Sequence, residues 1–224
     1  MLWLLEIKNC WQRDVQGFDV YINMAKSGGN RDRVMFLIKS CWSEYVEQVD
    51  MDTEDQIWVK LSLWPELRLG GVYIPPEDSP YYDRSLLGAL EGRVRDGKSV
   101  LVLGDFNARV GNPELLVEDS EMLQYENVKD LTVNSRGRSI MSMCQGNGML
   151  VANHLKIKEN CLGGNLSFRK RNWISEIDLC LVKNNLINKV KSLDILQGVR
   201  GSEHAPLTVV VDHIGTIPAE ILKK

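Results

Sequence analysis

We predict an α/β (α+β) fold for this chain, and two patterns in the sequence carry the prediction. Strand-like segments, apolar or alternating between apolar and polar side chains, lie at residues 45–50, 56–63 and 67–74. Residues 81–96 instead repeat their apolar side chains at helical spacing, and a short apolar strand at residues 100–103 follows directly. This strand–helix–strand unit, together with the antiparallel strands, indicates β-sheets flanked by helices.

Size and composition indicate one globular domain. The chain has 224 residues, of which 44% are hydrophobic and 25% charged. We assign residues 1–213 to the domain and residues 214–224 to a C-terminal tail. The five cysteines are scattered and form no CxxC pair, which argues against a disulfide framework or a structural zinc site and for a reducing, intracellular setting. No apolar run of the sequence approaches the roughly 20 residues that a membrane span needs.

The formal net charge of −3 counts against a protein that coats nucleic acid nonspecifically, because such a protein would be basic. It does not exclude a nuclease, because a metal site gathers acidic side chains while cations collect at its rim. Candidate rim residues are Arg136, Arg138, Lys156, Lys158 and the basic run Arg169–Arg171 beside Trp173. For the first two pairs we favour the alternative of a solvated surface loop.

The N-terminal half is predicted to be mainly β-structure. Further elements are expected as strands at residues 2–5, 18–23 and 34–38, a glycine turn at residues 27–30 and an acidic hairpin loop at residues 51–55. The first of these strands would deliver Glu6 at its end. The strand at residues 67–74 stops at Pro75 and Pro76, which fix the path of the chain just after Tyr73.

The predicted helix has an apolar stripe of Leu86, Leu87, Leu90 and Val94, and Gly97 is expected to close it as a C-cap. After the central strand the sequence predicts a surface excursion at residues 112–131, a short helix at 139–145, a strand at 148–153, a basic loop leading to Trp173, and strands at 177–182 and 206–211. No repeat or inter-domain linker interrupts this order.

A carboxylate and an amide follow the end of the central strand. The strand stops at Gly104, and Asp105 and Asn107 come directly after it, at the edge where open α/β sheets bind ligands. Both side chains can fix a phosphate oxygen, a water or a hard cation, and Gly104 allows a close approach of the backbone. The alternative is an Asx-type turn, which Asp and Asn often form. Taken alone, this motif does not decide between a ligand site and a turn.

Asp178 is informative because it interrupts an otherwise apolar strand. A buried carboxylate is costly without a partner, and the natural partner here is His204. An aspartate that holds one imidazole nitrogen would set the tautomer of the ring and raise the pKa of the other nitrogen. The other two histidines, His154 and His213, are interpreted as structural.

Five sequence motifs occur in the order found in one known enzyme family. Residues 104–107 (GDFN) resemble the signature of the endonuclease/exonuclease/phosphatase superfamily. With Ala108 and Arg109 the segment is similar to the apurinic-type endonuclease domain of non-LTR (LINE-type) retrotransposons. The other motifs are LLEIK at residues 4–8, VYIPP at 72–76, SEID at 175–178 and SEHAPL at 202–207. The resemblance spans about residues 2–212, nearly the whole chain.

The resemblance implies a four-layer sandwich of two packed mixed β-sheets flanked by helices, with the active site at one end among strand-terminal loops. Only five residues precede Glu6, so we expect the first strand of the family and the helix after it to be missing. The domain would then be N-terminally incomplete. The chain ends shortly after the last predicted strand, so we expect no reverse-transcriptase domain of the kind that full-length relatives carry.

For metal binding the resemblance points to two glutamates. Glu6 matches the residue that binds the catalytic divalent metal, Mg²⁺ or Mn²⁺, and a carboxylate suits Mg²⁺ because this cation takes hard oxygen ligands. Glu203 stands where the family has aspartate. The substitution keeps the charge but moves the carboxylate outward by one methylene group.

The resemblance also implies a role for each catalytic residue. Asp105 would orient or deprotonate the attacking water, and Asn107 would hold this water or a phosphate oxygen. His204, backed by Asp178, would bind a non-bridging oxygen as negative charge builds on it. Tyr73 matches the active-site tyrosine and would support the same phosphate.

The implied function is metal-dependent hydrolysis of phosphodiesters, in which target DNA is nicked to leave a 3′-hydroxyl that primes reverse transcription. DNA would be the partner of a monomeric, intracellular and nuclear protein without membrane association. The residues expected to bind nucleic acid are Arg109, Arg169, Lys170, Arg171 and Trp173. Two alternatives stay open: a degenerate, non-catalytic remnant, and an enzyme of the same fold that acts on an inositol phosphate, a sphingolipid or RNA.

Overall fold

The computed structural model describes residues 2–7, 15–22, 33–49, 55–112, 128–155, 166–171, 173–197 and 202–212, and for residues 2–7 and 33 it describes the backbone alone. Several predicted features lie outside the described residues: the glycine turn, residues 51–54 of the acidic loop, residues 113–127 of the excursion, Lys156, Lys158, His213 and the tail. The chain divides into two compact units, Met1–Gly104 with His213–Lys224, and Asp105–Asp212.

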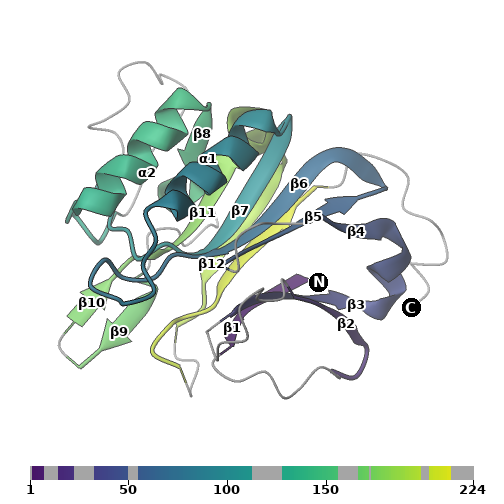
Figure 1. The fold of residues 1–224 in the computed structure, drawn as a ribbon, viewed down its shortest axis with the longest axis horizontal. Coiled ribbons are helices and arrows are strands. Elements are labelled where there is room, and N and C mark those ends of the chain that lie inside the picture. Colours follow the sequence, from purple (N-terminus) through teal and green to yellow (C-terminus); the bar gives the residue numbers. More distant parts are fainter. Residues whose placement is uncertain are drawn as a thin grey trace. The chain divides into compact units, whose positions relative to one another are not determined.

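The first unit contains two β-sheets, and their strands confirm the predicted segments. In one sheet β3 (Arg33–Lys39) pairs antiparallel with both β1 (Leu2–Ile7) and β2 (Phe18–Ile22) (Figure 1). The 3-10 helix η1 (Ser40–Tyr45) then leads into the second sheet, where the neighbouring strands are, in order, β4 (Val46–Val49), β5 (Gln56–Leu61), β6 (Trp64–Tyr73) and β7 (Ser99–Asp105).

These two sheets of the first unit pack face to face through β3 and β5. Val34, Phe36 and Ile38 of β3 form one buried cluster with Ile57 and Val59 of β5. We predicted β5 to be half-buried, and this was wrong for its first four residues, which are all buried. The reason is that β5 is covered on the opposite face as well, where helix α1 (Ser85–Asp96) contributes a contact.

The contact with α1 is made by the buried side chain of Gln56, which is also hydrogen-bonded to Trp58 on β5. The amide of Gln56 donates to the carbonyl oxygen of Leu86 in α1 at 3.0 Å and accepts a bond from the indole N–H of Trp58 at 3.2 Å. The apolar stripe of the helix is confirmed for Leu86, Leu90 and Val94, which are buried, whereas Leu87 is only half-buried. The polar groups of Gln56 and Trp58 are therefore satisfied inside the unit, as buried polar groups must be.

The ends of α1 differ from the prediction. The helix begins at Ser85 rather than at residue 81, because the Asp83 carboxylate accepts a 2.8 Å bond from the Ser85 N–H and holds the chain in a turn before the helix. Gly97 follows the last residue, as predicted, but its backbone is extended with φ −83°. Glycine is favoured there by space, since a Cβ at Gly97 would lie 2.2 Å from Val100 Cγ2.

The second unit begins with a helix and continues as antiparallel strand pairs (Figure 1). Helix α2 (Ser135–Gly146) is longer than the predicted segment, because Asn134 caps it by accepting the Gly137 N–H at 2.7 Å. The pairs are β8 (Met149–Val151) with β11 (Asp178–Lys183), β9 (Phe168–Lys170) with β10 (Trp173–Ser175), and β12 (Val190–Ile195) with β13 (Leu207–Val211). The 3-10 helices η3 (Ala152–His154) and η4 (Asn184–Lys189) follow β8 and β11.

The β9–β10 hairpin, strand β12 and the 3-10 helix η4 of this unit were not predicted. The basic loop expected before Trp173, residues 169–171, instead belongs to a hairpin of β9 and β10, with Arg171 at the turn in the left-handed region at φ 50°. Strand β12 was missed because its buried residues, Val190, Leu193 and Ile195, do not alternate strictly. Its pairing with β13 contains a register shift between Val190 and Ser192, which explains the broken pattern.

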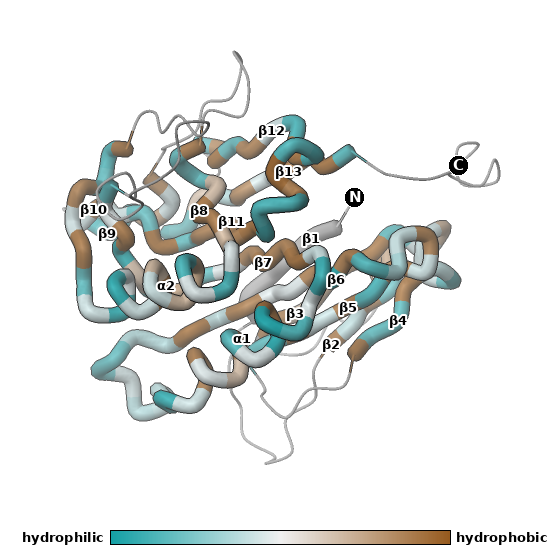
Figure 2. Tube along the Cα trace, turned by 90° about the horizontal axis from the view of Figure 1, so that it is seen from above, coloured by the Kyte–Doolittle hydropathy of each residue, from teal (hydrophilic) through white to brown (hydrophobic). Residues whose placement is uncertain are grey.

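The α/β sandwich class predicted from the sequence is confirmed. Each unit combines paired strands with a helix of 12 residues. The buried strands β7 and β11 are largely hydrophobic, as Figure 2 shows. No helix in the part of the chain that the structure describes is long and apolar enough to cross a membrane.

Candidate active site

The glycine of the GDFN motif is required by packing inside the first unit. Gly104 follows Leu103 in β7, whose first four residues are buried. A Cβ atom at Gly104 would lie 1.8 Å from the carbonyl oxygen of Val72 in β6, and the backbone φ of 155° is one that other residues rarely adopt. The close backbone approach expected from the sequence is therefore present, and it serves the sheet.

Asp105 and Asn107 form a turn that fixes both side chains. One Asp105 carboxylate oxygen accepts the backbone N–H of Asn107 at 2.8 Å, and the other accepts its side-chain amide at 3.0 Å. Asn107 has a φ of 47°, in the left-handed region that Asn occupies more easily than most residues. The Asx-type turn that stood as the alternative is thus present, and it holds a carboxylate and an amide side by side.

The contact that the sequence predicted between Asp178 and His204 is also present. The Nδ1 atom of His204 lies 3.0 and 3.1 Å from the two carboxylate oxygens of Asp178, and the side chains are 29% and 17% exposed. The first residue of β11 is held in place by Ser167, whose hydroxyl oxygen accepts the backbone N–H groups of Ile177 and Asp178 at 3.1 and 3.0 Å. With Nδ1 facing the carboxylate, Nε2 is the ring nitrogen on the other side of the imidazole.

The base of the β9–β10 hairpin supports the imidazole from a second direction. The ring of Phe168 lies 4.9 Å from the ring of His204, tilted by 58°. The backbone of the same segment bonds to the His204 segment on both sides, from Ala205 N–H to Ser167 and from Arg169 N–H to Glu203. The orientation of His204 is therefore tied to the hairpin as well as to Asp178.

Asp105, Asp178 and His204 together form one cluster. One potential ligand atom from each lies within 4.8 Å of the others. Two carboxylates fit Mg²⁺, which is commonly held by one or two carboxylates while it keeps several waters. Asp105 and Asp178 would hold such an ion, whereas an imidazole is a poorer ligand for a hard cation. The arrangement can therefore combine two carboxylates that would bind a metal ion with a histidine that would bind a substrate.

The N-terminal end of α2 holds the turn that carries Asn107. The guanidinium of Arg136 donates to the carbonyl oxygens of Phe106 and Asn107 at 3.2 and 3.4 Å, and Asn134 donates to the Asn107 carbonyl at 3.3 Å. Arg136 is 2% exposed, so the alternative that placed it in a solvated surface loop was wrong. Its charge is buried where it satisfies backbone carbonyls. A Cβ at Gly137 would lie 1.9 Å from the Arg109 carbonyl oxygen, so this approach also needs glycine.

Arg109 has a contact that the sequence did not indicate. Its guanidinium binds the Asp130 carboxylate through two bonds, at 2.6 and 2.8 Å. Asp130 is buried, although residues 112–131 were predicted to be a surface excursion, whereas its neighbours Lys129 and Leu131 are exposed as expected. Burial alone would raise the pKa of Asp130, but hydrogen bonds from Arg109 and from the N–H groups of Glu176 and Thr132 hold that pKa below its ordinary value.

The remaining predicted residues are not members of the cluster as the described residues define it. Tyr73 ends β6 in the first unit, where its N–H donates to Asp55 at 2.9 Å. For Glu6 the backbone position in β1 is described. Glu203 precedes His204 in the chain, and its carboxylate forms an ion pair with Lys170 at 3.1 Å. Arg169, Lys170, Arg171 and Trp173 all belong to the exposed β9–β10 hairpin.

Sequence reasoning missed several residues that build the site. Ser167, Asn153, Asp130 and Asn134 act through hydrogen bonds to backbone groups or to residues far along the chain. Only Asn134 had a local signal, since an Asn three residues before Gly137 is a typical helix N-cap. Apart from the bond between Asp130 and Thr132, the others bind partners 10 to 46 residues away, and no local pattern marks such contacts.

Comparison with solved structures identifies the class of fold. A 3′-5′ exonuclease from Neisseria meningitidis matches 94% of this chain and 89% of its own, at a TM-score of 0.63 and 18% identity. The endonuclease domain of TRAS1, a telomere-specific non-LTR retrotransposon, matches 93% and 85%, at 0.64 and 16%. The AP endonuclease LMAP from Leishmania major matches 90% and 72%, at 0.65 and 13%. The chain therefore has the endonuclease/exonuclease/phosphatase fold.

No family model matches the sequence, and no curated protein matches it significantly. The likeness is one of three-dimensional structure, at identities of 13–18%.

Proposed function

We propose that this protein is a metal-dependent phosphodiester hydrolase that nicks DNA, of the kind encoded by non-LTR retrotransposons. The observation that carries the proposal is the cluster of Asp105, Asp178 and His204, with one ligand atom of each within 4.8 Å of the others, on a chain with this fold. Asn107 is fixed beside it by Asp105. The retrotransposon assignment is supported by the likeness to the TRAS1 endonuclease domain and by the GDFNAR and VYIPP motifs. Its substrate would place it in the nucleus.

The protein's own side chains would divide the reaction between them. Asp105 orients the attacking water and takes up its proton, and the Asn107 amide holds the water or a phosphate oxygen. His204 donates a hydrogen bond from Nε2 to a non-bridging phosphate oxygen as charge builds there. For this bond both ring nitrogens must carry a proton, and Asp178, which faces Nδ1, would stabilise this imidazolium form and its orientation. Tyr73 would steady the same phosphate.

Mg²⁺ or Mn²⁺ would be held by Asp105 and Asp178, with Glu6 and Glu203 as further candidates from the sequence. When bound, the ion would polarise the phosphate and stabilise the leaving oxygen.

The function is tested by incubating the purified protein with supercoiled plasmid in Mg²⁺, in Mn²⁺ and in EDTA. We expect nicked circles with either metal and none in EDTA, because the metal ion held by the two carboxylates supplies the positive charge that polarises the phosphate. A DNA polymerase should extend the nick directly, since the product would carry a 3′-hydroxyl. Asp105→Ala and His204→Ala proteins, with folding checked by circular dichroism, serve as controls. Uncut plasmid with folded parent protein would overturn the proposal and favour the non-catalytic remnant.

The β9–β10 hairpin is proposed to bind the DNA. Trp173 is 73% exposed, and Arg169, Lys170 and Arg171 stand on the same short hairpin. An exposed indole beside three cations suits a nucleic acid, because the ring can stack on a base while the cations contact phosphates.

A Trp173→Ala variant should bind DNA less tightly without slower chemistry. Loss of a stacking contact costs about 1–3 kcal/mol, so KM for an oligonucleotide duplex should rise roughly 10-fold while kcat is unchanged. Tyr81→Ala is the matched control, since Tyr81 is also an exposed aromatic residue, at 57%, but lies in the first unit. Steady-state nicking at several salt concentrations measures both constants. Equal KM values for the two variants would exclude the hairpin as a binding element.

A further inference from the structure

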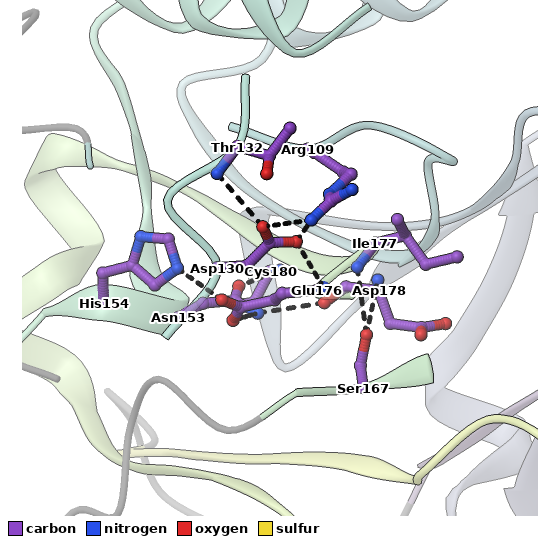
Figure 3. A network of polar contacts seen from close by, with 10 residues as sticks. All are labelled: Arg109, Asp130, Thr132, Asn153, His154, Ser167, Glu176, Ile177, Asp178 and Cys180. Carbon is purple, nitrogen blue, oxygen red and sulfur yellow. Dashed lines mark hydrogen bonds and ion pairs between the residues drawn. The ribbon is translucent and has the colours of Figure 1, made fainter. Parts of the chain in front are cut away.

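A continuous buried network joins the two segments that carry the cluster (Figure 3). It begins at Arg109, two residues after Asn107, whose guanidinium binds Asp130. The same Asp130 carboxylate accepts the backbone N–H of Glu176 at 3.0 Å. Glu176 stands two residues before Asp178, so the network reaches from one side of the cluster to the other.

The Glu176 carboxylate is the centre of the second half of this network. One oxygen lies 2.6 Å from Nε2 of His154, and the other accepts the Asn153 amide at 2.9 Å. The same amide nitrogen donates to the backbone carbonyl of Asp178 at 2.9 Å, and the Asn153 oxygen accepts the N–H of Cys180 at 2.7 Å. Glu176 therefore acts on β11 through Asn153 and through its own backbone.

The pair formed by Glu176 and His154 is more deeply buried than is usual for charged or titratable groups. The side chains of Glu176 and His154 are each 1% exposed. A buried ion pair contributes little to stability when compared with apolar residues of the same volume, because both groups lose their hydration. Side chains that only filled this space would not need polar groups, whereas side chains that fix the position of β11 need directional hydrogen bonds. Both His154 and Glu176 have their partners within the second unit.

We propose that Glu176, held by His154, is a positioning residue that sets the placement of Asp178, and through it of His204, relative to the turn of Asp105 and Asn107. The proposal deepens the proposed function, since it concerns the same cluster. It assigns a role to His154, which the sequence marked only as structural. Removing the Glu176 carboxylate should free the start of β11 and let Asp178 move relative to His204.

The kinetic test compares Glu176→Gln and Glu176→Ala with the parent. Small displacements of a catalytic group reduce turnover strongly, so we expect kcat to fall about 100-fold for Glu176→Ala, with KM unchanged. Glu176→Gln keeps the length and an oxygen for Asn153 and should retain part of the lost turnover. Gln56→Leu is the matched control, because Gln56 is also fully buried and hydrogen-bonded, but in the first unit between β5 and α1. It should lower Tm and leave kcat unchanged.

A spectroscopic test does not depend on catalysis or on metal. The chain has three histidines, so ring-labelled protein gives few NMR signals, and His204→Asn identifies the signal of His204. In the metal-free parent we expect the Nδ1 proton of His204 to exchange slowly with water, because it is shared with Asp178. In Glu176→Ala this proton should exchange fast, while in Gln56→Leu it should not change.

The two readouts separate the possible failures. One outcome is that both Glu176 variants lower Tm as Gln56→Leu does while kcat and the His204 signal stay as in the parent. In that case Glu176 is only structural and the proposal is overturned. If the parent cleaves no DNA, the proposed function fails, and the exchange of the His204 proton still decides whether Glu176 positions the pair. Should Glu176→Ala not fold, Glu176→Gln supplies both measurements.

Discussion

An Asp178→Asn variant is expected to turn over DNA roughly 1,000-fold more slowly than the parent protein, with a similar KM. Asparagine keeps the shape of the side chain, but its neutral amide replaces the negatively charged carboxylate that accepts the hydrogen bond from Nδ1 of His204. The doubly protonated ring then loses the charge that stabilises it and holds its orientation, and the hydrogen bond that stabilises the developing charge on the phosphate is lost. Single-turnover cleavage of a labelled duplex at saturating Mg²⁺ measures the effect on chemistry apart from any loss of metal affinity, since Asp178 is also proposed as a metal ligand.

Two further variants make this result specific. Asp194→Asn is the matched control, because Asp194 lies on β12 in the same unit and outside the cluster, and it should cleave at the rate of the parent. His204→Ala should cost about as much as Asp178→Asn, and the double variant little more, because residues that act as a unit are not additive. Additive losses would mean that Asp178 and His204 work independently, which would contradict the pair as described.

A Gly104→Ala variant should lose about 3 kcal/mol or more of unfolding free energy. The added Cβ would stand 1.8 Å from the Val72 carbonyl oxygen, so β6 and β7 would have to separate at the place where they lie side by side. Backbone atoms cannot move away as a flexible side chain can. Urea denaturation followed by circular dichroism gives the difference between the two proteins.

Gly88→Ala is the matched control for this substitution. Gly88 is exposed in the middle of α1, and nothing lies within 4 Å of a Cβ built there. Alanine is the better helix former, so this variant should be more stable than the parent by about 0.5–1 kcal/mol. If Gly104→Ala were as stable as the parent, β6 and β7 could not approach each other as closely as described.

Patterns of local origin could be read from the sequence alone. The alternation at residues 56–63 and the apolar stripe of the predicted helix follow from side-chain periodicity, and both elements are present as β5 and α1. The GDFN motif located the Asp105–Asn107 turn, because strand, glycine and Asx turn are adjacent in the chain. A costly aspartate in an apolar strand led to the contact between Asp178 and His204.

Contacts between distant segments were decided only by the tertiary structure. Arg109 meets Asp130 at a separation of 21 residues, and Glu176 meets His154 at 22, and no spacing rule connects such pairs. Arg136 was taken for a surface residue, since a charge is normally solvated, and it is buried because the carbonyls of Phe106 and Asn107 accept its bonds. Local patterns thus predicted most of the elements and located the GDFN motif, while contacts between distant segments decided which polar groups could be satisfied together, and so how the cluster is held.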